Sequence, residues 1–458
     1  MNPLDPDRQH RTAKLLVETA VVETLQRAID LLFSLRIQIH VAVDAAQSAV
    51  GQAACLTAVN TACRAFLGGC TVVLDHDPVC QVPWAFGRSL AAAVESHGAT
   101  ISPSIDPSVP TVAIGDIARS SEQAVWATWD GWISAAVDDP TQRLSESAGI
   151  EIAGVAAGAL AVSELFQARS GNASAARRNV GISLWRPDLR YASLDAQGPQ
   201  IEYLPNRLWL LGLGHLGQAT AWNLGMLPYT DRSDVELMLM DSDALVEANL
   251  GTSLLARPAD IGTAKTRVTA HRLEATGFRT RIVERRFTSD LTVAPGEPLI
   301  AIAGFDNAIA RAALGDAGFE RVVDIGLGGG AAYNDILVHT FPGKTSPKVA
   351  FEARPVRAVD LGRYERSIEE IVDAGLADDA LARCGMVAIA GTTASASFVG
   401  ALAGALGVAD LLRSLHSGCD FDVVNVDLRS AMTDGAKSAR ARPRTAVAYT
   451  NAAMPAGK

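Results

Sequence analysis

Cysteine and aromatic residues are scarce in this sequence, and the cysteines that are present are isolated. The 458 residues include six cysteines, none of which forms a CxxC pair, and aromatic residues make up 5% of the chain. Without cysteine pairs a structural zinc site is not expected, and six thiols in a chain of this length are too few for a disulfide scaffold. We therefore expect reduced thiols and a cytoplasmic location.

Positive charge is also in deficit, because 40 lysines and arginines face 50 aspartates and glutamates. The net charge of −10 gives no bulk attraction to nucleic acid or to an anionic membrane, so we expect neither as a partner. No secretory signal is expected at the N-terminus. Residues 385–409 carry no charge and are long enough to cross a bilayer, but their Gly, Ala, Ser and Thr content favours a buried helix preceded by a strand or loop.

Apolar residues recur with helical and strand periods in a regular order. Residues 13–36 predict one amphipathic helix. Strands that are apolar throughout and alternate with helices predict an α/β fold with a parallel sheet covered on both faces. Two such strand–helix–strand units are expected, at 37–43, 51–66 and 71–75 and at 207–214, 218–227 and 235–241.

The two units are related to one another. Residues 51–53 and 217–219 both read Gly-Gln-Ala, and Asp75 matches Asp241, each at an offset of 166 residues. We therefore interpret the chain as two degenerate copies of one Rossmann-like, doubly wound α/β unit. The domains that we expect are an N-terminal helical segment over 1–36, a first copy over 37–195 and a second copy over 196–458.

Each copy closes on a similar helix that is rich in small residues. Residues 154–165 resemble residues 400–411 at an offset of 246, so the second copy carries 80 extra residues before its closing helix. Glycines four apart in both helices permit a close approach to a neighbouring helix. An interface between the two copies is one option for that neighbour.

A glycine-rich loop follows the first strand of the second copy. Gly212, Gly214 and Gly217 form a GxGxxG motif, whose glycines allow a tight turn, the approach of a nucleotide and close helix–strand packing. The first copy keeps only Gly51, so we expect the second copy to hold the nucleotide site. Because many dehydrogenases share this motif, a nicotinamide-dependent enzyme is one alternative.

Two acidic residues end the next strand of the second copy. Asp241 and Asp243 stand where a carboxylate can accept hydrogen bonds from a ribose diol. A loop carboxylate or a helix cap is the alternative interpretation of either residue. The residues that follow decide between the two.

Several short motifs after Asp243 fall in the register of one known family. They are Asn249-Leu250, Arg257-Pro258, Asp260-Ile261-Gly262 and Lys265, followed by Asp306-Asn307 and Arg311. Over residues 207–412 the sequence resembles the ubiquitin-activating adenylyltransferases, the family of the ThiF, MoeB and HesA proteins. The first copy resembles the inactive adenylation half of the eukaryotic members, so one chain would form a pseudo-dimer, with a homodimer as a further option.

The resemblance implies ATP and Mg²⁺ as cofactors. Adenylation brings together two anions, a carboxylate and a triphosphate, and therefore needs cations that stabilise the developing charge. A solvated lysine and a turn carboxylate are the alternatives for Lys265 and Asp306. The resemblance implies that Lys265 and Asp306 are catalytic: Lys265 acts on the β- and γ-phosphates, and Asp306 is the magnesium ligand. It implies that Asp241 and Asp243 bind the ribose and that Asn249 contacts phosphate. The other residues implied in nucleotide binding are Gly212, Gly214, Gly217 and Asn307.

One position departs from the family pattern. Where the family has an arginine that contacts phosphate, this chain has Thr252, and a hydroxyl group cannot replace a guanidinium there. In relatives a further arginine reaches in from the N-terminal region of the partner subunit. Arg8 and Arg11 lie where such an arginine could originate, but we expect both to be solvated tail residues.

Cys384 is the candidate nucleophile. In several relatives a cysteine before the closing helix takes over the activated acyl group as a thioester, and the adjacent Arg383 permits the lowered pKa that a thiolate needs. A buried structural thiol is the alternative. The spacing from Cys384 to the following glycines also differs from that in the relatives.

The resemblance thus implies an ATP-dependent activating enzyme. Its substrate would be the C-terminal carboxylate of a ubiquitin-like β-grasp protein or of a peptide, ending in glycine, and Cys384 could pass the acyl group to a conjugating enzyme. Sulfur-carrier or peptide activation without a thioester is one alternative. A non-catalytic scaffold is another, because of Thr252. The family's pathways include sulfur transfer, protein conjugation and antiphage defence.

Overall fold

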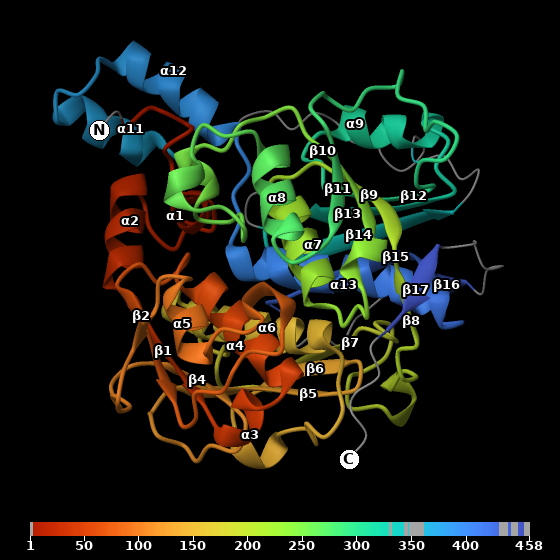
Figure 1. Cartoon of the computed structure of the whole chain (residues 1–458). Coiled ribbons are helices and arrows are strands. Elements are labelled where there is room, and N and C mark those ends of the chain that lie inside the picture. Colours follow the sequence, from red (N-terminus) through yellow and green to blue (C-terminus); the bar gives the residue numbers. More distant parts are fainter. Residues whose placement is uncertain are drawn as a thin grey trace.

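The chain folds into two α/β halves, each built on its own sheet, which meet through a layer of helices (Figure 1). The computed structural model describes residues 3–328, 332–342, 347, 361–429, 438–440 and 448–452. The first half contains strands β1 to β7, and the second half contains strands β9 to β16.

The first sheet has seven described strands in the order β3-β2-β1-β4-β5-β6-β7. The strands from β3 to β5 in this order are parallel, and β6 and β7 are antiparallel to their neighbours. Their bounds are β1 Arg36–Val41, β2 Gly69–Leu74, β3 Thr100–Ile101, β4 Thr111–Ile114, β5 Ala124–Asp130, β6 Ile133–Val137 and β7 Val180–Ser183.

The second sheet has eight described strands in the order β11-β10-β9-β12-β13-β14-β15-β16. The strands from β11 to β13 are again parallel, and the remaining three are antiparallel. A separate pair joins β8 Tyr203–Pro205 to β17 Tyr449–Asn451. The bounds in the sheet are β9 Arg207–Leu211, β10 Glu236–Met240, β11 Arg279–Val283, β12 Ile300–Ala303, β13 Arg321–Leu327, β14 Asp335–Pro342, β15 Asp420–Asp427 and β16 Ser438–Arg440.

The two sheets have the same strand order, which confirms the expected α/β fold of two repeated Rossmann-like units. In each half the first strand lies at the centre, the second and third follow on one side, and the fourth and fifth on the other. The order in which the chain adds strands therefore changes direction between the neighbouring parallel strands β9 and β12 of the second half. Ligands of such sheets bind at this reversal, beyond the carboxyl ends of the strands.

Four helices fill the space between the sheets: α4 Ala49–Ala62, α6 Glu151–Arg169, α7 His215–Met226 and α13 Ser397–Leu415. The paired glycines pack each closing helix against the first helix of its own half. A Cβ at Gly158 would lie 2.4 Å from the carbonyl oxygen of Ala54, and one at Gly404 would lie 2.7 Å from the backbone of Ala219. These glycines therefore do not form the interface between copies. The halves meet elsewhere on α6 and α13, where Phe166 and Phe398 pack at 5.3 Å.

Helices α6 and α13 are long and apolar enough to cross a membrane by length and composition. In the structure 89% of the apolar window of α6 and 94% of that of α13 is buried. Both are core helices of the described fold. The uncharged stretch 385–409 accordingly contains the end of one helix, a loop and most of α13, as its composition predicted.

The N-terminal segment forms two helices, so the prediction of one helix over 13–36 is wrong. Helix α1 spans Arg11–Glu18 and α2 spans Leu25–Ser34. The break is fixed by Thr24, whose side chain accepts a hydrogen bond from the backbone of Arg27 at 3.2 Å and so begins a new helix. Both helices pack beside α11 Glu365–Asp373 and α12 Asp379–Ala390 (Figure 1). The remaining α-helices described are α3 Val43–Ala46, α5 Leu90–Glu95, α8 Lys265–Glu274 and α9 Ala308–Ala313.

A buried ion cluster ties α13 to the second sheet. Arg321 of β13 donates to Asp410 at 2.5 Å and to Asp420 at 2.8 Å, and Arg413 donates to Asp410 at 3.0 Å. The side chains of Arg321, Asp410 and Arg413 are at most 1% exposed.

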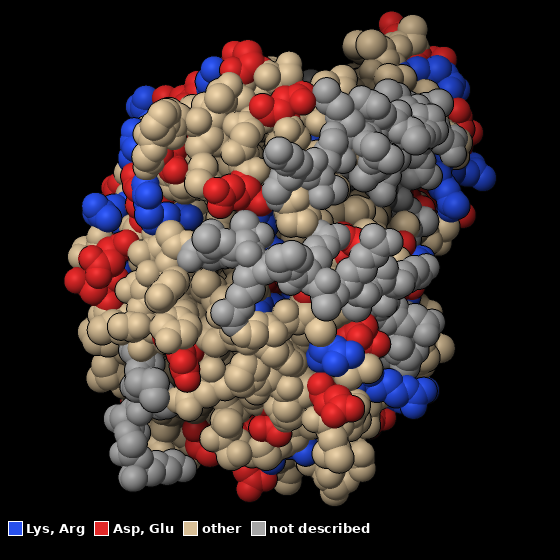
Figure 2. All heavy atoms as spheres, turned by 90° about the vertical axis from the view of Figure 1, so that its right-hand side faces the viewer, with Lys and Arg blue, Asp and Glu red and all other residues tan. Residues whose placement is uncertain are grey.

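The surface charges differ from this cluster. Figure 2 shows exposed residues of both charge signs intermixed over the described part of one face. Exposed pairs of that kind contribute at most about 1 kcal/mol.

Replacing the central cation of this cluster should destabilise the fold. Arg321→Met is expected to lower the free energy of unfolding by about 3–5 kcal/mol, because Asp410 and Asp420 then stay buried without it. Arg366→Met, which breaks an exposed 3.0 Å pair with Glu369, should cost less than about 1 kcal/mol. Urea denaturation measures both. A loss for Arg321→Met no larger than that of the control would contradict the role of the cluster.

Candidate nucleotide site

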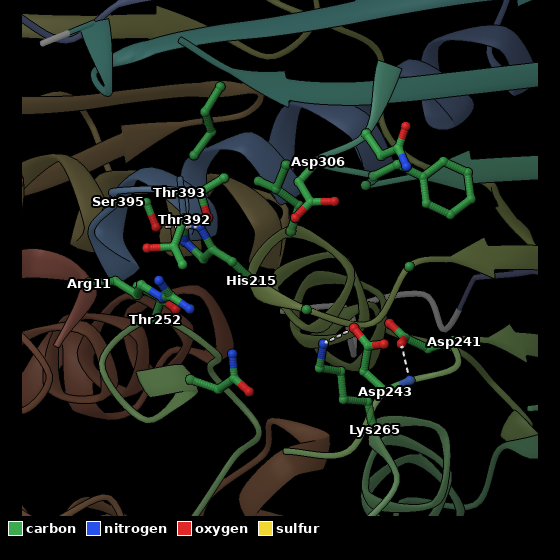
Figure 3. A pocket seen from close by; sticks show the side chains of 18 of the residues that line it. Arg11, His215, Asp241, Asp243, Thr252, Lys265, Asp306, Thr392, Thr393 and Ser395 are labelled. Atoms are coloured by element: carbon green, nitrogen blue, oxygen red, sulfur yellow. Dashed lines mark hydrogen bonds and ion pairs between the residues drawn. The ribbon is translucent and has the colours of Figure 1, made fainter. Parts of the chain in front are cut away.

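A cavity of about 1250 Å³ lies beyond the carboxyl ends of β9, β10 and β12. It is lined by the glycine loop, the loops after β10 and β12, residues 390–395 before α13, and helix α1 (Figure 3). Lys265 and residues 285–287, 327–328 and 363–364 also line it. The cavity thus lies where the strand order of the second sheet changes direction, between β9 and β12. Its volume exceeds the range of about 300–1,000 Å³ that is usual for small-molecule sites.

The glycine loop has the backbone geometry that its motif predicts. Gly212 has a positive φ of +82°, and a Cβ at Gly217 would lie 1.8 Å from the carbonyl oxygen of Gly212. Asp241 fixes this loop, because its carboxylate accepts from the backbone of Leu213 at 2.6 Å and of Asp243 at 2.8 Å. Gly214 lines the cavity, and a Cβ there would meet no atom within 4 Å.

Asp243 and Lys265 form an ion pair at one side of the cavity (Figure 3). Lys265 Nζ lies 2.9 Å from Asp243 Oδ2, with side chains 11% and 58% exposed respectively. Partial burial alone would raise the pKa of Asp243, but the hydrogen bond and charge of Lys265 lower it below its usual value. Asp243 is therefore ionised at neutral pH, and the Lys265 side chain that it binds lines the cavity.

Asp306 and Asn307 follow β12 at the edge of the cavity. Asn307 caps α9 by accepting from the backbone of Ile309 at 2.8 Å, whereas Asp306 is exposed and projects into the cavity (Figure 3). Among the described residues no group of three or more His, Cys, Asp and Glu could hold a metal ion alone. A magnesium ion at Asp306 would thus need oxygen ligands from a bound phosphate chain, which suits the preference of Mg²⁺ for that arrangement.

The loop that carries Asn249 and Thr252 is held by the first half. Arg64, directly after α4, donates to the carbonyl oxygens of Leu250, Leu254 and Ala256, the last at 3.0 Å. Asn249 itself accepts from the backbone of Val246 at 2.9 Å and lines the cavity. The first half therefore sets the position of a segment that belongs to the site.

Arg11 lines the cavity, so the expectation that it is a solvated tail residue is wrong. The N-terminal segment pairs with the loop of Thr252, since the backbone of Ala248 donates to the carbonyl of Asp7 at 2.7 Å. Burial lowers the pKa of Arg11, while the charges of Asp7 and Asp306 oppose that shift. Its Nη1 is buried and has no hydrogen-bond partner among the described residues. Arg8 is half-exposed and remains a surface residue.

Residues 391–395 form the wall of the cavity next to Arg11 (Figure 3). Ser395 Oγ lies 2.9 Å from Nδ1 of His215, which stands inside the glycine motif. Burial, with a smaller effect of the Arg64 charge, lowers the pKa of His215 to about 4. The imidazole is therefore neutral at pH 7 and joins this wall to the glycine loop.

Cys384 lies apart from the cavity in this structure. It is exposed on α12 and is not among the described residues that line the cavity. The guanidinium of Arg383 is engaged by Glu365 and Asp379, at 3.0 Å each. The alternative of a buried structural thiol is thus wrong, and the role of Cys384 as a nucleophile stays a prediction.

The first half fills the equivalent place with its own residues. Helix α3 and an acidic side chain, Asp44, occupy the position of the glycine loop, and Asp44 accepts from the backbone of Asp116 at 3.3 Å. Arg143 lies 2.9 Å from Asp116 and 3.9 Å from Asp44. A carboxylate placed between the two loops repels a phosphate chain, which favours the prediction of an inactive first half.

Comparison with known proteins identifies the family. Residues 36–184 match the model described as the BilD N-terminal domain, and residues 204–418 match that of the BilD C-terminal domain. The bacterial E1-like protein BilD of Collimonas sp. (strain OK412) is 35% identical over 428 residues, which cover 92% of this chain and 91% of that protein. This chain belongs to the bacterial E1-like BilD family.

Solved structures show a more distant likeness. E. coli MccB is 14% identical with a TM-score of 0.33 over 55% of this chain and 63% of that chain, and E. coli MccB with ATP is 15% identical with a TM-score of 0.31 over 48% and 60%. The chain thus spans less than two thirds of the matched MccB chains. BilD family membership confirms the resemblance to activating enzymes at the level of the family, while the roles of single residues stay predictions.

The contacts of Arg64 lead to a prediction about the loop of Asn249 and Thr252. Arg64→Met is expected to lower the free energy of unfolding by about 1.5–3 kcal/mol and to speed backbone hydrogen exchange over residues 249–256, because three carbonyls lose a charged donor. Arg177→Met, at an exposed arginine of the same half, should change neither. Exchange mass spectrometry and urea denaturation measure both effects, and unchanged exchange over 249–256 would contradict this role.

His215 makes stability depend on pH in a defined window. Its pKa is about 4 in the folded chain against an ordinary 6.5, so the unfolded chain binds the proton first as the pH falls. Stability contributed by neutral His215 is therefore present above pH 6.5 and is lost progressively toward pH 4. His215→Gln should show a smaller fall in thermal midpoint between pH 6.5 and pH 4.5 than the native chain. An equal fall in both proteins would disprove this assignment.

Proposed function

We propose that this chain uses ATP and Mg²⁺ to adenylate the C-terminal carboxylate of a ubiquitin-like β-grasp protein or of a peptide, ending in glycine. One observation carries the proposal: Arg11, Lys265 and Asp306, from three separate elements, converge on one large cavity in a chain of an E1-like family. The unpartnered buried Nη1 of Arg11 favours an anionic ligand at this place.

The chemistry follows from the charges that line the cavity. A carboxylate oxygen of the substrate attacks the α-phosphorus of ATP, the bond to the bridging oxygen of the β-phosphate breaks, and pyrophosphate leaves with that electron pair. Lys265 and Arg11 stabilise the charge that develops on the phosphates from opposite sides of the cavity (Figure 3). Arg11 would thereby supply the guanidinium that is absent at Thr252.

The residues present also suit a magnesium ion. Asp306 would hold it, and the ion would act as a Lewis acid that withdraws charge from the phosphate oxygens. Asn307 caps α9 and so keeps Asp306 at the edge of the cavity. Asp243, which is 58% exposed, has free lone pairs for a ribose hydroxyl, whereas Asp241 shapes the loop that receives the phosphates.

The first half would act as a scaffold, so that one chain forms the pseudo-dimer. Its Arg64 holds the loop of Asn249, and its own nucleotide position is filled by Asp44 and Arg143. A further homodimer is not needed to complete the site.

Transfer to Cys384 is the proposed second step. The exposed thiol would attack the acyl-adenylate carbonyl, release AMP and pass the acyl group to the thiol of a conjugating enzyme. Because Cys384 lies outside the cavity, this step requires α11 and α12 to move relative to the glycine loop.

Mass spectrometry after incubation with ATP and the substrate protein tests the transfer to Cys384. An adduct on Cys384 that hydroxylamine removes is expected. An acyl-adenylate without an adduct would leave adenylation as the whole reaction.

Adenylation itself is tested by substrate-dependent exchange of labelled pyrophosphate into ATP. Asp306→Ala and Arg11→Met are each expected to lower the exchange rate about 100-fold, because each removes a charge that stabilises the transition state. Arg8→Met, in the same N-terminal segment but outside the cavity, should retain the native rate. The substrate for this assay is a ubiquitin-like β-grasp protein that ends in glycine. Full exchange by Asp306→Ala would disprove the magnesium site.

A further inference from the structure

A buried lysine joins the N-terminal helix to the cavity wall. The side chain of Lys14, on α1, is 1% exposed, and its Nζ lies 2.7 Å from Glu18 Oε1. The same Nζ donates to the carbonyl oxygens of Ala390, at 3.1 Å, and of Thr392. All three acceptors therefore converge on a single ammonium group, which none of the proposed chemical steps uses.

Apart from the contact of Ser395 with His215, the segment that Lys14 holds is positioned through its backbone. Residues 391–395 line the cavity and read Gly-Thr-Thr-Ala-Ser, so their side chains are too short to anchor the segment from a distance. Lys14 binds two carbonyls at its start, and Thr12 donates to the carbonyl of Ser395 at 3.2 Å at its end. Helix α1 thus fixes both ends of this wall.

The same helix places Arg11. Lys14 follows Arg11 by three residues and Glu18 follows by seven, so the three side chains share one face of α1. Glu18 also lines the cavity and accepts from the hydroxyl of Tyr364 at 2.8 Å. A shift of Lys14 would move the guanidinium of Arg11 and the backbone of residues 390–395 together.

Attachment of the N-terminal segment does not require this lysine. Ser367 accepts from the backbone of Leu25 at 3.0 Å, and Leu4 packs against Gly385, so α2 and the first residues are already fastened to α11 and α12. Loss of Lys14 alone would leave Glu18 without its ion-pair partner, so a fall in stability is expected whether or not Lys14 also positions the cavity wall. Its positioning role is therefore measured at residues 390–395 and in kcat.

We infer that Lys14 is a positioning residue, which sets the backbone of residues 390–395 and the guanidinium of Arg11 in the arrangement that adenylation requires. The inference rests on the proposed function for its effect on rate, but the contact with residues 390–395 can be measured without it. Misplacement of reacting groups by about 1 Å lowers rates by about 100-fold. The effect belongs to kcat, because Asp243, the proposed ribose contact, lies in the loop after β10 and away from residues 390–395.

The test compares Lys14→Met, which keeps chain length but removes the donors, with Lys14→Arg, which keeps charge and donors. In Lys14→Met we expect hydrogen exchange over residues 390–396 to rise about tenfold, and kcat for ATP–pyrophosphate exchange to fall 10- to 100-fold with KM for ATP changed less than threefold. Lys14→Arg should recover part of both. Ser367→Ala, which removes a hydrogen bond at the same junction away from Lys14, should match the native chain.

The outcomes separate the two proposals. Native exchange protection over 390–396 and native kcat in Lys14→Met would overturn the role of Lys14. Faster exchange over 390–396, in a chain whose native form shows no ATP–pyrophosphate exchange, would support the contact and overturn adenylation. Should Lys14→Met fail to fold, Glu18→Gln removes the charge that faces Lys14 while keeping an acceptor, and the same local rise in exchange is expected; its absence would overturn the inference.

Discussion

The close approach of helix backbones between the two sheets is the constraint on which the rest of this structure depends. Gly158 lets α6 touch α4, and Gly404 lets α13 touch α7, at distances that no Cβ would permit. Interiors packed at this density have discrete arrangements and do not deform smoothly. Each closing helix is therefore held in one position within its own half. The halves then meet where Phe166 of α6 packs against Phe398 of α13 at 5.3 Å, and Arg64 reaches across to the loop of Asn249.

The two halves of this duplicated fold differ at the place where the second half has its large cavity. Both halves have the same order of their first seven strands, so in both the strand order changes direction beside the central strand. In the second half three glycines leave that place open, with Lys265 at its edge. In the first half Asp44 and helix α3 fill it. The difference lies in a few loop residues. The first half also contacts the second, through Arg64 and the loop of Asn249.

Sequence patterns predicted the strands and the glycine loop because these are local properties. An apolar run such as 207–211 reports burial on both faces, and GxGxxG reports a turn that only glycine adopts. The single helix predicted over 13–36 failed because both helices there are amphipathic, and only the capping residue Thr24 marks the break. Arg64 was missed because the carbonyls that it binds lie 186 to 192 residues away in the chain. Arg11 was wrongly expected to be a solvated tail residue, because the segments that it meets in the cavity, such as that of Asp306, are also distant in the chain. Periodicity holds no information at that distance.

The position of Arg11 gives a physical reason for the two halves to share one chain. In the related activating enzymes an arginine comes from the partner subunit, so the site is complete only when two chains associate. Here the N-terminal segment is covalently part of the chain that contains the cavity, and its contacts with Ala248 and Ser395 fix where it enters. Linkage replaces association by an intramolecular step of high effective concentration. Arg11 and the cavity wall are then together at every protein concentration.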